Sequence, residues 1–159
     1  MRIIGLILSF GLISFIGCGG DKGAAGASSP EDLAKSLVGS FGDAAKFKKL
    51  LPSEGDLNAL MKCEGDKNMM AEQIKKLGEE AEKEFAAMKD IKMEFVSAET
   101  KDTKSIKKGE KQGPCEALKD FEVAKIKVKM KMTKGDETKE NSEGFRGVKI
   151  DGKWYVTDL

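Results

Sequence analysis

The stretch FEVAKIKVKMKM, residues 121–132, constrains the fold more than any other part of this 159-residue chain. From Lys125 onward lysine occupies every second position, and an apolar residue fills each position between. Successive side chains of a β-strand point to opposite faces, so the pattern predicts a strand with one buried and one solvated face. Phe121 and Val123 are out of phase with the later apolar residues, which predicts a β-bulge near Ala124.

The residues before this strand have helical periodicity. Ser29 followed by Pro30 is typical of a helix start. A break at residues 42–43 separates this helix from a second, short one, and a third is expected to restart at Ser53. The longest helix is predicted over about residues 67–89, where apolar side chains recur every three or four positions. They are Met70, Ile74, Leu77, Ala81, Phe85 and Met88.

After residue 89 the period becomes alternating. Residues 91–96, IKMEFV, predict a strand, whereas residues 99–120 are interpreted as a polar loop. A further strand is expected over residues 137–150, and Asp151-Gly152 is a favoured pair for a type I′ hairpin turn before the last strand. The order predicts an α+β domain, with N-terminal helices packed on one face of a meander of about four antiparallel strands.

The last strand contains the one tryptophan of the chain, Trp154. An indole buries about 150 to 250 Å², so its placement matters in a chain with few aromatic residues. We predict that Trp154 packs on the core side beside Phe121 or Val148, while Lys149 and Lys153 face water. The alternative is that Trp154 lines a ligand pocket.

Two stretches resemble the NTF2-like (cystatin-like) superfamily, especially its small bacterial lipoproteins. SPEDLAKSLVGSFGDAAKFKKLL is similar to the opening helix, break and second helix of that superfamily, and VKIDGKWYVTDL is similar to its closing hairpin. The resemblance implies a sheet that wraps a cone-shaped pocket. Enzymes of the superfamily tend to use Asp, His or Tyr residues in that pocket, and no residue here is assigned such a role.

Residues 1–17 have the order of a signal peptide, with Arg2, then an apolar run over residues 3–16, then Gly17 before Cys18. FIGC at residues 15–18 resembles the lipobox of bacterial lipoproteins, which implies cleavage before Cys18 and acylation of this cysteine. The alternatives are an uncleaved anchor or an ordinary secretory signal with an incidental cysteine.

The domain prediction follows from that cleavage. Residues 18–28 would form a flexible tether rich in small residues, and residues 29–159 a single α+β domain. The membrane is then a partner only through the acyl chains on Cys18. Gly19 rather than aspartate follows the cysteine, which by the sorting rule of enteric bacteria favours the outer membrane, facing the periplasm.

The remaining cysteines, Cys63 and Cys115, are predicted to form a disulfide, because an exported protein meets an oxidising compartment. Two free thiols or a metal site are the alternatives. The chain has no histidine, which argues against zinc and excludes Ser-His-Asp and Cys-His catalysis. No cofactor is expected. Removal of residues 1–17 leaves 27 cationic and 27 anionic side chains, a balance that argues against a general nucleic-acid binder.

The lysine row, defined as Lys125, Lys127, Lys129 and Lys131, is the one feature with a candidate binding role. It could meet anionic lipid head groups, lipopolysaccharide or an acidic protein partner. The alternative is a solvated face whose charges are neutralised by carboxylates on neighbouring strands. The candidate carboxylates are Glu94, Glu137, Glu140 and Glu143.

Two functions follow as hypotheses. The first is a non-enzymatic binding or interaction module anchored in the cell envelope. The second is a hydrolase or isomerase that uses a carboxylate in an NTF2-like pocket. A buried carboxylate in a concave apolar pocket would favour the enzyme, whereas a filled cone would favour the binding module.

Overall fold

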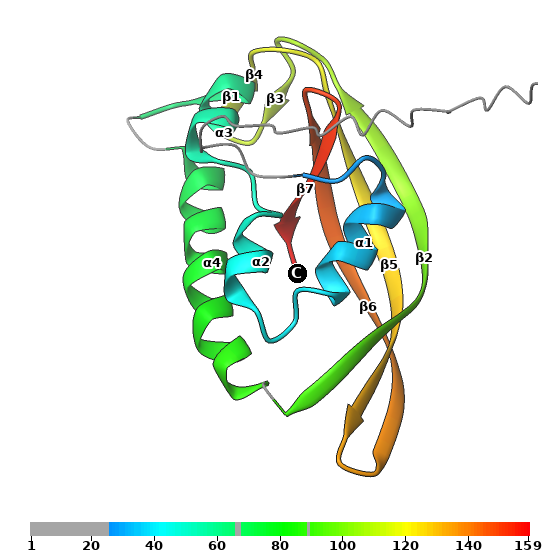
Figure 1. Cartoon of the computed structure of the whole chain (residues 1–159). Coiled ribbons are helices and arrows are strands. Elements are labelled where there is room, and N and C mark those ends of the chain that lie inside the picture. Colours follow the sequence, from blue (N-terminus) through cyan, green and yellow to red (C-terminus); the bar gives the residue numbers. More distant parts are fainter. Residues whose placement is uncertain (1–25, 66–67, 89) are drawn as a thin grey trace, which may run out of the picture.

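The computed structural model describes residues 26–65, 68–88 and 90–159 (Figure 1). The elements follow in the order α1 (Pro30–Val38), α2 (Ala44–Lys48), α3 (Glu54–Leu60), β1 (Met61–Cys63), α4 (Met69–Ala87), β2 (Ile91–Ile106), β3 (Lys111–Gln112), β4 (Cys115–Ala117), β5 (Phe121–Lys134), β6 (Glu137–Ile150) and β7 (Lys153–Asp158). The fold class is therefore α+β, as predicted.

The strands form two antiparallel sheets. The large sheet has four strands in the order β2-β5-β6-β7, and the small sheet has three in the order β1-β4-β3. In Figure 1 the small sheet lies at the top, and the tip of the β5–β6 hairpin projects at the bottom. The four-stranded antiparallel sheet was predicted, whereas the small sheet was not.

Side-chain caps explain where the helices begin. Ser29 accepts a hydrogen bond from the backbone N–H of Asp32, and Pro30 occupies the first helical turn. The helix predicted from Ser53 starts with a full capping box, because Ser53 and Asp56 each bond the other's backbone N–H. The long helix is α4, and it lies within the predicted range.

One face of the large sheet, here called the helix face, packs against α1, α2 and α4. Alternate β5 residues from Ala124 to Met130 are buried there, together with Phe145, Trp154 and Val156. Gly147 permits close packing, since a Cβ added to it would lie 3.1 Å from Cδ2 of Leu33 on α1. The core therefore fills the space between the helices and this face.

The opposite face is called the lysine face, because it carries the lysine row. At the end near the small sheet this face is also buried. Its residues there form a second cluster with Leu60, Met61 and Ala117: Ile106, Phe121, Val148, Ile150 and Tyr155. Both faces of the large sheet are therefore covered at this end.

This double coverage corrects the predicted bulge near Ala124. β5 pairs with β6 in unbroken register, so Phe121 and Val123 lie on the lysine face, in the same phase as the lysines. They are apolar because the small sheet packs against that end of the strand. The register shifts occur instead in β2, between Phe95 and Ser97 and between Thr100 and Asp102.

The polar loop predicted over residues 99–120 is also wrong. β2 continues through its polar half to Ile106, and β3 and β4 follow. The side chains from Glu99 to Ser105 are exposed, so this half of the strand has no apolar alternation from which it could be predicted. Backbone pairing with β5 holds this half of β2 in the sheet.

Trp154 is buried, with 5 % of its surface exposed, so the structure places it in the core rather than in a pocket lining. Its predicted neighbours were wrong, because Phe121 and Val148 belong to the second cluster on the lysine face. Lys149 does not simply face water: its Nζ lies 5.9 Å from the Trp154 ring centroid and 2.9 Å from Glu122 Oε2.

The predicted type I′ turn at Asp151-Gly152 agrees with the backbone, which has a positive φ at both residues: 49° and 83°. Lys153, which follows the turn, is exposed as expected.

Candidate binding site

Away from the small sheet, the lysine face of the large sheet is open. Eight cationic side chains lie there: Lys92, Lys101, Lys104, Lys125, Lys127, Lys129, Lys131 and Arg146. Five carboxylates accompany them: Glu94, Glu99, Asp102, Glu140 and Asp158. This surface therefore has an excess of three positive charges, although the side-chain charges after residue 17 balance.

The carboxylates proposed to neutralise the lysine row do so only in part. Glu94 and Glu140 lie directly opposite Lys131 on the two neighbouring strands, and Glu140 Oε1 is 3.7 Å from Lys131 Nζ. Glu137 and Glu143 are in register with helix-face residues, so that part of the interpretation was wrong. Strand parity alone places them on the other side of the sheet.

The other three lysines of the row, Lys125, Lys127 and Lys129, form no ion pair within 4 Å among residues 26–65, 68–88 and 90–159. Glu99 is opposite Lys127, yet it pairs with Lys101 Nζ at 2.6 Å. The hydrogen bond from Lys101 is the main cause of the lowered pKa of Glu99, and Lys127 and Lys129 add smaller contributions. Most of the row thus keeps its charge available.

A hollow of about 490 Å³ lies beside the row. Its cations are Lys101, Lys125, Lys127 and Arg146, and the acidic residues Glu143 and Asp158 also line it. Arg146 Nε lies 3.9 Å from Asp158 Oδ2. Arg146 and Lys125 are directly opposite each other on β6 and β5, an arrangement of like charges that destabilises a sheet. Gly144 lies opposite Lys127, and a Cβ added there would meet nothing within 4 Å. The glycine leaves room where any other side chain would fill the hollow.

A larger cleft of about 800 Å³ adjoins the hollow and shares Lys125, Arg146, Asp158 and Leu159 with it. It lies between α4 and the lysine face. Its apolar lining comes from α4 and from both sheets: Met61, Met70, Leu77, Ile106, Phe121 and Val123. Charges of both signs line the rest, with Lys76 and Glu80 on α4 facing Asp102 and Lys104 on β2.

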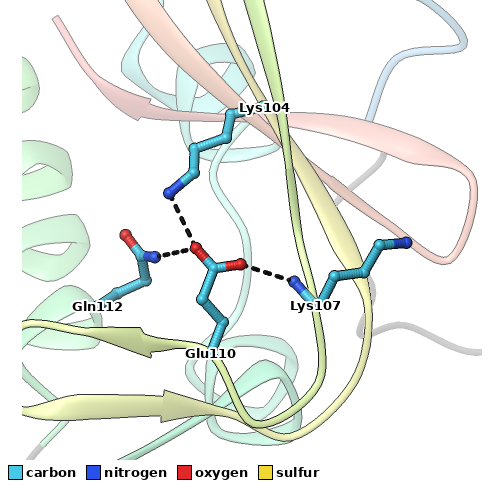
Figure 2. Close-up of polar contacts among 4 residues, drawn as sticks. All are labelled: Lys104, Lys107, Glu110 and Gln112. Carbon is cyan, nitrogen blue, oxygen red and sulfur yellow. Dashed lines mark hydrogen bonds and ion pairs between the residues drawn. The ribbon is translucent and has the colours of Figure 1, made fainter.

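A carboxylate network fixes one wall of the cleft (Figure 2). Glu110 accepts hydrogen bonds from Lys104 Nζ at 2.9 Å, the Lys107 backbone N–H at 3.1 Å and Gln112 Nε2 at 2.9 Å. These bonds, with that from Lys104 the strongest, lower the pKa of Glu110. Lys104 is therefore neutralised, and the loop between β2 and β3 is tied down.

The described residues offer little acid–base chemistry. The cleft carboxylates Glu80, Asp102 and Asp158 are all exposed. Ser40 is the one buried polar residue in the part of the chain that the structure describes, and its Oγ donates to Leu37 O. Burial raises the pKa of Tyr155, but this side chain belongs to the second cluster.

Cys63 and Cys115 lie directly opposite each other on β1 and β4, and the structure joins them in a disulfide. The bond holds the small sheet that closes one end of the cleft. No group of three or more potential metal ligands occurs within the described ranges. Cys18 and the predicted signal peptide lie outside those ranges, as does most of the predicted tether.

No family model, curated protein or solved structure matches this chain in the comparisons. Among the residues with described positions, no helix has the length and apolar character needed to span a membrane.

Sequence reasoning found the lysine row but missed Arg146, Lys101 and the cleft. A signal for Arg146 was present. The two-residue turn at residues 135–136 pairs Lys134 with Glu137, and this register carries Lys125 to Arg146. Lys101 lies within the register shift between Thr100 and Asp102 in β2, and no residue pattern predicts that shift.

Proposed function

We propose that this protein is a non-enzymatic binding module of a bacterial cell envelope, anchored by acyl chains on Cys18 and binding an anionic partner on its lysine face. The observation that carries the binding role is the absence of ion pairs at Lys125, Lys127 and Lys129 among the described residues. Unpaired like charges at alternate positions on one face of a strand cost stability, and a site for an anion gives a reason to keep them.

The anchor and the location rest on the sequence. Arg2, the apolar run and the Gly17-Cys18 step support lipidation, and Gly19 supports the outer membrane facing the periplasm. Helices on one face of an antiparallel sheet and the closing Asp151-Gly152 hairpin are compatible with an NTF2-like fold. We keep that family as part of the proposal.

The enzyme alternative has less support. It needs a carboxylate held in an apolar pocket, where burial would raise its pKa and suit it to proton transfer. The carboxylates that line the cleft are exposed, and the helix face is filled by the core. A binding role requires neither a buried carboxylate nor an open helix face.

Mass spectrometry of the full-length protein made in a bacterial host tests the anchor. We expect a diacylglycerol on Cys18, with residues 1–17 removed. Cys18→Ser should leave an uncut, unlipidated precursor. An unmodified Cys18 in the wild-type protein would contradict the anchor.

Binding of inorganic tripolyphosphate, a multivalent anion, tests the lysine face. The full chain is placed in phosphatidylcholine vesicles, and Lys125, Lys127 and Lys129 are changed together to glutamine. Three exposed contacts of about 0.5 kcal/mol each predict roughly tenfold weaker binding. The matched control changes Lys35, Lys75 and Lys83, which are exposed on α1 and α4. Equal losses in the two triple variants would reject the lysine face as the site.

A further inference from the structure

We propose that the hollow and the cleft together bind a single-chain phospholipid, with its phosphate among the cations of the hollow and its acyl chain in the cleft. The inference rests on the proposed function and names the ligand class. It starts from one fact of geometry, namely that Lys125, Arg146, Asp158 and Leu159 line both spaces, so the two adjoin. We take the ligand to extend past these side chains from one space into the other.

The hollow and the cleft together are here called the groove. The cleft provides its apolar half. Met70 and Leu77 on α4 and Val123 on β5 are only half-buried, so apolar surface there is left for a ligand to cover. The volume of about 800 Å³ lies within the range of about 300 to 1,000 Å³ typical of small-molecule sites. Burial of each methylene contributes about 0.8 kcal/mol, which is about fourfold in affinity.

The hollow provides the charged half. Lys125 and Lys127 are two residues apart on the same face of β5, with Arg146 directly opposite Lys125 on β6. A phosphate offers three acceptor oxygens, and a guanidinium can bind two of them at once. Four cationic residues and two acidic residues, Glu143 and Asp158, line the hollow, which leaves an excess of two positive charges. A carboxylate ligand offers fewer acceptors and a single charge, so this excess favours phosphate.

The groove has one apolar end and one positively charged end. At the small-sheet end, Glu110 neutralises Lys104, and the floor is formed by Ile106 and Phe121. At the hollow end, Lys125 and Lys127 form no ion pair within the described part of the chain. This separation of apolar lining from free positive charge matches an amphiphile rather than a small anion alone.

Photolabelling tests the inference on the full chain in phosphatidylcholine vesicles. The probe is a lysophosphatidic acid with a C16 chain and a diazirine at the chain end. We expect labelled peptides that contain Met70 or Leu77. Unlabelled competitors are compared at matched mole fractions in the vesicles. We expect lysophosphatidic acid to reduce labelling by the probe most strongly, and palmitic acid and hexadecanol to compete at least tenfold more weakly.

A matched pair of variants locates the head group. Gly144→Leu fills the hollow, whereas Thr138→Leu places the same side chain on the same face of β6 outside it. We expect Gly144→Leu to reduce labelling at least tenfold and Thr138→Leu to leave it unchanged. Equal labelling of these two variants would overturn the inference.

Two competitors test the phosphate site and the acyl-chain site separately. Palmitic acid as effective as lysophosphatidic acid would overturn the phosphate assignment, and glycerol 3-phosphate as effective would overturn the acyl-chain site. Each failure leaves tripolyphosphate binding intact, so it is distinguishable from a failure of the proposed function.

Discussion

The two faces of the large sheet use the same strands and have different surroundings. On the helix face, apolar residues continue along β5 from Ala124 to Met130, and the helices close over them. On the lysine face, apolar residues stop after Val123, and the covering layer stops with them. One strand thus contributes to a closed core and to an open charged surface.

The two faces are closed by different means. α1 and α4 are long enough to cover the helix face by their own apolar sides. The small sheet has strands of two or three residues, which bury little area and depend on the Cys63–Cys115 disulfide. The lysine face is therefore covered at one end by the small sheet, which depends on the disulfide, and is open at the other end.

The largest effect is expected on the helix face. Trp154→Ala should lower the free energy of unfolding by about 3 to 5 kcal/mol, because it empties a buried site. Chemical denaturation of the full chain measures the change. A loss below about 1 kcal/mol would show that Trp154 is not part of a packed core.

The disulfide should come next. Changing Cys63 and Cys115 together to serine should cost roughly 2 to 4 kcal/mol, because the bond closes a loop with a sequence separation of 52 residues. Hydrogen exchange distinguishes the faces. We expect faster exchange at Glu64 and Ala117, whose amides donate hydrogen bonds beside the small sheet, before any change in α1. Uniform acceleration would contradict separate closure of the two faces.

Two glycines of β6 give a matched comparison at a smaller scale. Gly147→Ala should cost about 1 to 3 kcal/mol, because its Cβ would press on Leu33 Cδ2 and on Tyr155 O. Gly144→Ala should be neutral or slightly stabilising, because the lysine face is open there. Chemical denaturation measures the free energy of unfolding of both variants. Equal losses would mean that both faces are packed at these positions.

Acid should loosen the cleft wall. The pKa of Glu110 is lowered from its usual 4.5, so its bonds to Lys104 and Lys107 persist above that value and are lost as the pH falls through the lowered pKa. Hydrogen exchange at the Lys107 amide should accelerate over this range relative to its intrinsic rate. Glu110→Gln should weaken this dependence, and an unchanged profile would contradict the network.

Much of the fold was predictable because it depends on local chemistry. Caps, breaks and helical spacing identified the helices around Ser29, Ser53 and residues 67–89, and alternation identified β5. The small sheet escaped prediction because strands as short as β3 carry no measurable period. Phe121 was misjudged because a strand buried on both faces loses its alternation, and only tertiary structure shows which layer covers it.

The candidate site was predictable in part. The lysine row was apparent from the spacing of four residues, and its carboxylate neighbours depended on strand register. Met70 and Leu77 were assigned to the core by helical spacing, and both do pack against core clusters. Their half-buried state, which makes them part of the cleft, depends on how far α4 stands from the sheet.

The helix face maintains the fold, and we propose that the lysine face binds an anion. The most direct test measures two quantities on one variant, Lys125, Lys127 and Lys129 changed together to glutamine: the free energy of unfolding and the affinity for tripolyphosphate. We expect unchanged or slightly higher stability, because like charges are removed, with roughly tenfold weaker binding. A loss of stability above about 1 kcal/mol with unchanged affinity would contradict this proposal, because surface charges away from specific interactions rarely cost that much.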